Sequence, residues 1–258
     1  MDPPRVRGTK DKEVSMKKLF VFMALAAFLV ASAGADVYIK SKTHTDPMSM
    51  MGQNTPAKDD IVEQWLGDDV FSMKTGGTGS IVDLKKGVIY IINHNEKSYI
   101  ESTLPLDFSK LLPAEMAAMA QGMMKMTVTV SPNGQTKTIG SWPCKGYDVT
   151  MQMMMMPMKM AVWATTEVPF DLNKYMEKTY GAQLAAQLRL DDAAIAEMKK
   201  IKGYWIASET TMEMMGAKIR TTSEVVEMTK KTPPAGVYTV PAGYKKQDKL
   251  SMKELQGR

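Results

Sequence analysis

Cysteine and histidine are almost absent from the sequence, which contains one cysteine, Cys144, and two histidines, His44 and His94. A single thiol cannot form an internal disulfide, so the fold must be held by its core even in an oxidising compartment. General acid–base catalysis most often uses a positioned histidine or a tuned carboxylate pair, and nucleophilic catalysis needs a base within hydrogen-bond reach. No spacing of this kind occurs in the sequence.

The acidic pairs do not supply a catalytic dyad either. A strand points adjacent side chains to opposite faces, and adjacent acidic residues more often occupy turns or helix caps. The glycine-rich run at residues 76–79 lacks the Gly-Lys-Ser/Thr ending of a phosphate-binding loop and predicts a turn. We therefore expect a protein that is not an enzyme and has no cofactor. The adjacent acidic pairs are Asp59 with Asp60, Asp68 with Asp69, and Asp191 with Asp192.

Long hydrophobic runs are scarce, and the longest occupies residues 19–30, near the N-terminus. Lys17 and Lys18 precede this run and small residues follow it, which is typical of a secretory signal peptide. The run is shorter than the roughly 20 residues of a spanning helix, which disfavours the alternative of an uncleaved anchor. We predict a leader at residues 1–35 that starts at Met16 and is cleaved after Ala35, or alternatively after Ala33. The mature chain is then periplasmic or secreted.

The basic character of the chain resides partly in this leader. The whole sequence has a net charge of +5, and removal of residues 1–35 leaves 27 basic and 25 acidic residues. A net charge of +2 gives little support for a nucleic-acid partner. We expect one domain at residues 36–245 and a basic, solvated tail at residues 246–258 that could meet anionic lipid head groups.

Short segments with alternating apolar and polar residues dominate the mature chain, and this alternation predicts β-strands. Turn residues separate them, notably at 93–96 and 131–134, and Pro157 predicts a bend. The expected strands are residues 37–45, 61–66, 70–75, 80–84, 88–93, 98–102, 126–130, 135–139, 147–155, 158–165, 204–214 and 218–228.

Helices are expected at three places between the strands. Residues 113–121 begin with a proline and continue with good helix formers. Residues 173–188 and 192–200 follow the capping residues Asp171 and Asp191. An antiparallel sheet with one apolar face needs a cover on that face. We therefore predict an α+β fold: a strongly curved, antiparallel sheet, or open half-barrel, with helices covering its concave face.

Methionine accounts for 26 residues, and its densest run follows a strand period. One face of the run is apolar, whereas Asp148, Thr150 and Gln152 lie on the other. A similar face recurs on residues 204–214. Because methionine is unbranched and flexible, such a wall can fit ligands of variable shape. The predicted ligand-binding residues are Tyr147, Val149, Met151, Met153, Met155, Met158, Met160, Ile206, Met212 and Met214.

Three interpretations of the methionine stripe remain open. Apolar residues at strand period are most often ordinary core, and the protein would then be a structural or stress-related envelope protein. A lipid or a lipoprotein acyl chain is the hydrophobic ligand that we favour. The third interpretation is a Cu(I) or Ag(I) site, because thioethers are soft ligands. Its best candidates are Met48, Met50 and Met51, although neither histidine adjoins a methionine cluster. Cys144 is expected to be a buried or inert thiol in a Trp-Pro-Cys-Lys turn.

Several local patterns resemble those of a bacterial secreted group known only as domain-of-unknown-function family 4412. Together they span most of the mature chain, and none of them is decisive by itself. They are Ile-Val-Asp-Leu-Lys-Lys-Gly at 81–87 with Lys-Ser-Tyr at 97–99, Trp-Pro-Cys-Lys-Gly-Tyr at 142–147, Thr-Met-Glu-Met-Met-Gly at 211–216, and Pro-Ala-Gly-Val-Tyr-Thr-Val-Pro-Ala-Gly-Tyr at 234–244.

This group is similar to the LolA/LolB/RseB-like half-barrels, in which an open antiparallel barrel and a helical plug enclose an apolar cavity. Some of those relatives carry lipoproteins or sense them through their acyl chains. The resemblance implies a fold more firmly than a ligand, because no residue-level binding signature carries over.

Overall fold

A computed structural model describes most of the chain. The chain divides into two units, Met1–Ala35 and Asp36–Arg258, and the account below concerns the second. Residues 1–34 of the predicted leader lie outside the described residues, as do most of the predicted helix at 113–121 and the predicted site residues Met51 and Met155. The described residues are 35–50, 53–113, 126–153, 156–188, 190, 192–214 and 217–250.

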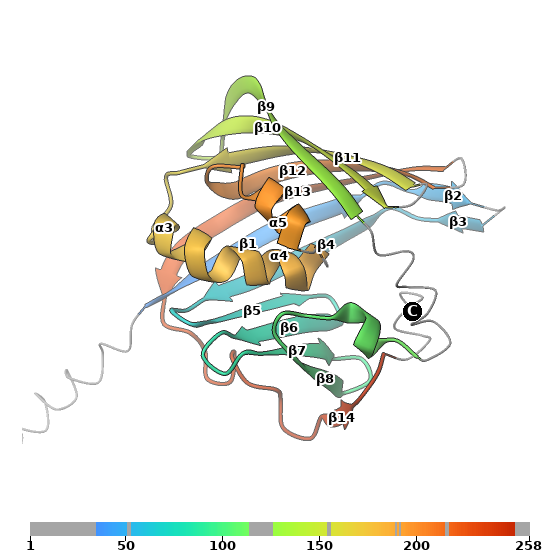
Figure 1. Cartoon of the computed structure of the whole chain (residues 1–258), viewed down its shortest axis with the longest axis vertical. Coiled ribbons are helices and arrows are strands. Elements are labelled where there is room, and N and C mark those ends of the chain that lie inside the picture. The colour runs from blue at the N-terminus through green and yellow to red at the C-terminus, as the bar shows by residue number, and fades with distance from the viewer. Residues whose placement is uncertain are drawn as a thin grey trace, which may run out of the picture. The chain divides into compact units, whose positions relative to one another are not determined.

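Twelve strands form one large sheet, in the order β14-β8-β7-β6-β5-β4-β1-β13-β12-β11-β10-β9 (Figure 1). Neighbouring strands are antiparallel except for β14, which is parallel to β8. The two ends of this order, β14 and β9, do not pair, so the sheet is open. The strands are β1 (Asp36–Thr45), β4 (Lys58–Leu66), β5 (Val70–Thr75), β6 (Thr78–Asp83), β7 (Val88–Asn93), β8 (Ser98–Thr103), β9 (Met126–Ile139), β10 (Trp142–Met153), β11 (Met156–Thr165), β12 (Tyr204–Met214), β13 (Ala217–Lys231) and β14 (Lys245–Gln247).

The strand period assigns one face of the sheet to the hydrophobic core. We call this the inner face, and its most deeply buried strand residues belong to a single cluster that extends across the sheet. The opposite, outer face carries most of the charged residues. A separate hairpin, β2 (Met48–Met50) with β3 (Gln53–Thr55), follows β1. The deepest residues of the inner face are Ile39, Phe71, Val82, Ile89, Val149, Val162 and Ile206.

The helical segment between β11 and β12 contributes buried residues to the same cluster. Asp171 caps its start, because the carboxylate accepts a 3.0 Å hydrogen bond from the Lys174 backbone N–H. Glu197 accepts a hydrogen bond from the Val130 backbone N–H of the edge strand β9. Helices therefore pack against the sheet through both apolar and polar contacts. The elements are α3 (Leu172–Lys174), a π-helical turn η3 (Tyr175–Thr179), α4 (Tyr180–Leu188) and α5 (Asp192–Met198), and a 3₁₀ turn, η2 (Phe108–Leu111), follows β8.

The predicted turn at residues 131–134 is wrong, because β9 continues through it as one strand. The pairing with β10 instead shifts register between Lys145 and Tyr147. Gly134 has a φ of +73°, and Asn133 donates to the Asp148 carboxylate across the irregularity at 3.1 Å. Turn-forming residues thus make a bulge here, in which residues 133–135 of β9 lie opposite Gly146 alone and the strand does not end.

Two further expectations for the neighbouring strands are also wrong. Pro157 lies within β11, opposite Gln152, and does not mark a bend. It occupies the end of its strand, where a missing N–H removes little of the ladder. Cys144 lies within β10, opposite Lys137, and not in a turn. The turn that connects β9 to β10 is formed by Gly140 and Ser141.

The outer face is also covered over part of the sheet, which the sequence did not indicate. Tyr38, Trp65, Ile81 and Ile92 are buried on this face of β1, β4, β6 and β7. Residues 232–244 run past these strands from β13 to β14 (Figure 1), and Pro234 and Pro241 line a groove with Trp65 and Ile81. At these positions β4, β6 and β7 are therefore buried on both faces.

The segment predicted as a solvated tail begins inside the fold. Lys245 opens β14 and donates its backbone N–H to the Lys97 carbonyl at 2.9 Å. Lys246 forms a 2.9 Å ion pair with Glu101 on β8. Leu250 is buried against Ile100 and Leu111. The predicted boundary between residues 245 and 246 thus falls within a strand, and the fold continues at least to Leu250.

Replacement of Gly203 by alanine should destabilise the protein strongly. A Cβ at Gly203, whose φ is +127°, would lie 2.4 Å from the Thr165 carbonyl oxygen. We expect a loss of about 3 kcal/mol or more in the free energy of unfolding, measured by urea denaturation. The matched control is Gly134→Ala, where φ is +73° and a Cβ meets nothing within 4 Å, with an expected loss of about 1 kcal/mol. Equal losses for the two variants would contradict the close packing of β11 against the start of β12.

Candidate functional site: a cavity on the inner face

Methionines from three adjacent strands are aligned on the inner face. Met158 on β11 pairs with Met151 on β10 and with Met212 on β12. We call these three residues the methionine row. Met151 is only 3% exposed, whereas Met158 and Met212 are half-buried. The part of the row on β11 and β12 is therefore only partly covered by other side chains.

The face predicted for the methionine run is confirmed where it is described. Tyr147, Val149 and Met151 are buried, whereas Asp148, Thr150 and Gln152 are exposed. The same alternation continues on the adjacent strand, where Met160 is buried opposite Val149.

Two predicted site residues are placed by their backbone alone. Met153 lies in register between Met126 and Met156, and Met214 lies opposite Ala217. Their side chains, like the whole of Met155, are outside the described part of the structure.

A cavity of about 250 Å³ lies next to this row, beneath η3 and α4. Met160 and Ile206, both predicted site residues, line it. Met160 pairs with Thr210, two residues along the strands from the pair Met158 and Met212 and on the same face. The cavity and the methionine row are therefore consecutive parts of one surface. The other lining residues are Ser41, Gln64, Tyr175, Tyr180, Gln183, Leu184, Tyr204, Trp205, Ala207, Ser208, Thr210, Ser223 and Val225.

Two glutamines connect the roof of the cavity to its floor. Tyr175 donates to Gln183 at 2.6 Å, and Gln183 donates to Gln64 on β4 at 2.8 Å. Tyr204 on β12 donates to the same Gln64 oxygen at 3.3 Å. Buried polar groups are costly unless they are hydrogen-bonded, so this chain fixes the helical segment over one position on the sheet.

The floor of the cavity carries hydroxyl groups on neighbouring strands. Ser208 on β12 pairs with Ser223 on β13. The Thr43 hydroxyl on β1 donates to Ser223 at 3.3 Å. Ser41, also on β1, is 6% exposed. Hydroxyls both donate and accept hydrogen bonds, so this floor can satisfy a polar ligand group of either kind.

The lining of the cavity is uncharged. None of the described residues around it is Asp, Glu, Lys, Arg or His. Burial raises the pKa of Tyr175, Tyr180 and Tyr204, so all three phenols are neutral. The indole N–H of Trp205 is buried beside Tyr180 but makes no hydrogen bond of ordinary geometry within the described structure.

The sequence pointed to the apolar part of this site and missed its polar part. The missed residues Gln64 and Gln183 come from segments far apart in the chain. Tyr175 and Tyr180 lie on a helical stretch that was expected only as a cover. The sequence offered one signal for Gln64. It is a polar residue at a position that the strand alternation assigns to the apolar face.

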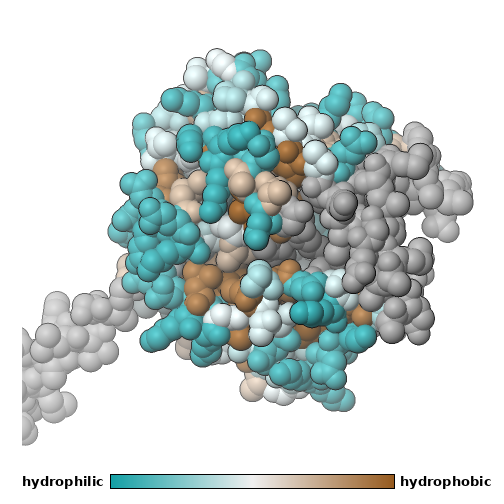
Figure 2. All heavy atoms as spheres, in the orientation of Figure 1, coloured by the Kyte–Doolittle hydropathy of each residue, from teal (hydrophilic) through white to brown (hydrophobic). Residues whose placement is uncertain are grey.

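A second hollow, of about 620 Å³, lies where α4 and α5 approach the loops after β6 and β8. Leu84, Leu104, Leu106 and Ile195 line it. Figure 2 shows brown, hydrophobic surface in the band between the helices and these lower strands. The predicted methionine residues do not line this hollow, so it is separate from the candidate site.

The predicted soft-metal residues are only partly described. Met48 and Met50 lie on β2, opposite Thr55 and Gln53. No cluster of three His, Cys, Asp or Glu residues suited to a metal ion occurs within the described ranges. Cys144 is 2% exposed, as expected for a buried thiol, and burial raises its pKa.

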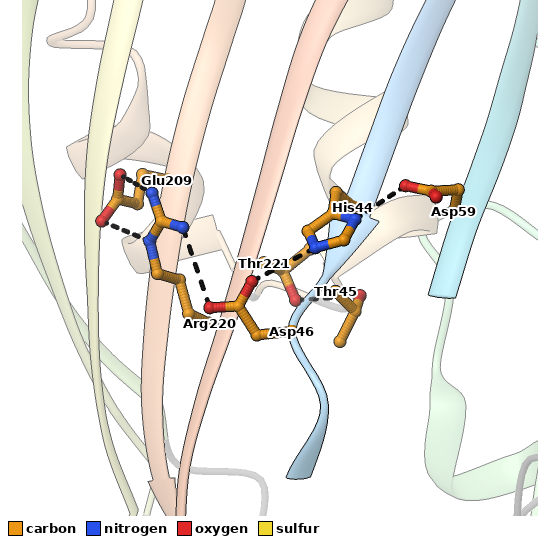
Figure 3. Close-up of polar contacts among 7 residues, drawn as sticks. All are labelled: His44, Thr45, Asp46, Asp59, Glu209, Arg220 and Thr221. Carbon is orange, nitrogen blue, oxygen red and sulfur yellow. Dashed lines mark hydrogen bonds and ion pairs between the residues drawn. The ribbon is translucent and has the colours of Figure 1, made fainter. Parts of the chain in front are cut away.

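A chain of ion pairs crosses the outer face on the opposite side of these strands (Figure 3). His44 contacts Asp59 at 2.7 Å and Asp46 at 3.3 Å. Asp46 lies 3.7 Å from Arg220, which donates two hydrogen bonds to Glu209 at 2.8 and 2.9 Å. The chain connects β4, β1, β13 and β12 at the ends near Thr45 and Thr221.

The comparisons with known proteins do not assign this chain to a family. No family model and no curated protein matches it. A solved structure of PNGF-II in the C2 space group aligns with 87% of this chain at 12% identity and a TM-score of 0.37. This chain spans about a third of the length of that protein. A likeness at this score does not establish a shared fold. Among the described helices, none has the length and hydropathy to cross a bilayer.

The two histidines should titrate in opposite directions. The hydrogen bond that His44 donates to the Asp59 carboxylate raises the pKa of His44 above 6.5, whereas burial lowers the pKa of His94. The contribution of His44 to the free energy of unfolding is fully present below pH 6.5. It is lost as the pH rises through the raised pKa of His44. The contribution of His94 is fully present above pH 6.5. It is lost as the pH falls through the lowered pKa of His94.

NMR titration of the two imidazole resonances measures this difference. The variant Asp59→Asn should lower the pKa of His44 and leave that of His94 unchanged, because His94 contacts Tyr244 and not this chain. A single common pKa near 6.5 for both histidines would contradict the described contacts.

Proposed function

We propose that this protein is an extracytoplasmic, non-catalytic binding protein that holds a hydrophobic ligand, such as a lipid or a lipoprotein acyl chain. The sheet would act as a half-barrel whose concave face is the inner face, with the helical segment from α3 to α5 covering it. The observation that carries this proposal is the methionine row, whose half-buried members Met158 and Met212 adjoin a cavity.

Methionine suits this role for a physical reason. Its thioether side chain has three rotatable bonds and fills irregular spaces, so a row of methionines adapts to chains of different shape. Ligand pockets are mostly apolar, with a few polar groups that fix orientation. The inner face has this composition, since Met160, Ile206 and Val225 alternate with hydroxyl and amide groups around the cavity.

The location follows from the sequence. The predicted signal peptide would deliver the chain across the inner membrane, where lipids and acylated proteins must be carried through water. The resemblance to the LolA/LolB/RseB-like half-barrels supports the same class of ligand by analogy.

The variant Met158→Gln/Met212→Gln tests the proposal. Full burial of a methionine contributes about 1.5–3 kcal/mol. For two half-buried side chains we expect roughly tenfold weaker binding each, and about a hundredfold for the pair. The measurement is the fluorescence of a pyrene-labelled alkyl chain titrated with the protein.

The matched control is Lys159→Gln/Thr211→Gln. Lys159 and Thr211 pair with each other on the same two strands, one position along, and point to the outer face. The control should bind the probe like the wild type. If the methionine variant unfolds at lower urea concentration but binds the probe unchanged, the row is ordinary core and the proposal fails.

A further inference from the structure

The cavity differs from a purely apolar pocket in one respect. Its lining combines the uncharged hydrogen-bonding groups of two glutamines, three tyrosines, three serines and one threonine with Met160, Leu184, Ile206 and Val225. Such a surface offers donors and acceptors but no full charge.

Charged residues on the same strands are directed elsewhere. Glu209 and Glu224 lie on the outer face, where Glu209 binds Arg220. On the inner face, Lys58 and Asp60 form a 2.8 Å ion pair with each other and do not line the cavity. A carboxylate, phosphate or ammonium group that entered the cavity would therefore lose part of its hydration without gaining a counter-charge, which is unfavourable.

The hydrogen-bonding groups match a neutral polar group. The Trp205 indole N–H is a buried donor next to the Tyr180 hydroxyl, and Ser208 and Thr210 present hydroxyls at the half-buried floor. An ester or amide carbonyl accepts from an indole N–H, and an alcohol can both donate to and accept from the hydroxyls.

The strand register sets the orientation of such a ligand. Thr210 and Met160 form one cross-strand pair at the cavity, and Met212 and Met158 form the next pair outward. A polar group seated in the cavity would thus place an attached hydrocarbon chain along the methionine row. The cavity volume of about 250 Å³ suits a small head group.

We propose that the cavity selects amphiphiles with an uncharged, hydrogen-bonding head, such as an alcohol, ester or amide, and excludes those with a charged head. This inference rests on the proposed function and adds the chemical class of the ligand and the direction in which it enters.

Calorimetric titration with four ligands that carry ten-carbon chains tests the selection. The uncharged ligands are 1-decanol and 1-monodecanoylglycerol, and the charged ones are decanoate and decyltrimethylammonium, all below their micelle concentrations at pH 8. Because the chains are of equal length, the hydrophobic contribution is similar. We expect the uncharged ligands to bind at least about tenfold more tightly than either ion. Decanoate should bind more tightly as the pH falls toward the ordinary pKa of a carboxyl group.

Two variants connect the selection to the cavity. Thr210→Val removes one hydroxyl while keeping the shape of the side chain, and should weaken binding of monodecanoylglycerol several-fold. Thr210→Lys places a cation at the floor and should raise the affinity for decanoate relative to monodecanoylglycerol. Thr211→Val, on the outer face of the same strand, is the matched control and should change neither affinity.

Each outcome is decisive. If decanoate or decyltrimethylammonium binds as tightly as the uncharged ligands, the selection is wrong while the hydrophobic binding function stands. If none of the four ligands binds, the proposed function fails, and the inference fails with it. If preference for the uncharged head is seen but is the same in both Thr210 variants, the head group does not occupy this cavity, and the inference is wrong.

Discussion

The alternation of side chains along antiparallel strands is the constraint on which the rest of the structure depends. The period along each strand is two, and β10 with β11, β11 with β12 from Met158 to Trp163, and β12 with β13 pair without a shift of register. A residue type that recurs on each of these strands therefore forms a row across the sheet. The methionine row arises in this way, and so does the row of Ser208 and Ser223 beside it. A slip of one residue in any of these strands would turn its methionines toward the outer face.

The helical segment creates the cavity, because it meets the sheet through polar contacts at a fixed point. The hydrogen bonds from Tyr175 to Gln183 and from Gln183 to Gln64 hold the start of α4 above β4. Tyr204 joins the same chain from β12. A purely apolar contact would not fix the helical segment at one position, so the segment could move and cover the floor of the cavity. The chain of hydrogen bonds is directional and fixes one position. The polar network therefore helps to determine where the inner face stays accessible.

Much of the sheet could be predicted from the sequence. β5, β7 and β12 have the predicted bounds, and the alternation from Tyr147 to Met151 assigns the correct face. Where prediction failed, long-range contacts decide the outcome. Ser-Pro-Asn-Gly at 131–134 is a strong turn signal, but pairing with β10 on both sides converts it into a bulge. The pairing of β14 with β8 and the hydrogen bond from Gln183 to Gln64 each join residues more than 100 positions apart in the sequence. Local sequence patterns do not encode such contacts.

The most direct test of the account is a methionine-methyl NMR spectrum recorded with saturating 1-monodecanoylglycerol. If the inner face receives the ligand, the methyl resonances of Met158, Met160 and Met212 should shift together with a common dissociation constant. The resonance of Met48, on the separate hairpin β2–β3, should stay in place. Binding that shifts Met48 while the three inner-face resonances remain unchanged would contradict the account.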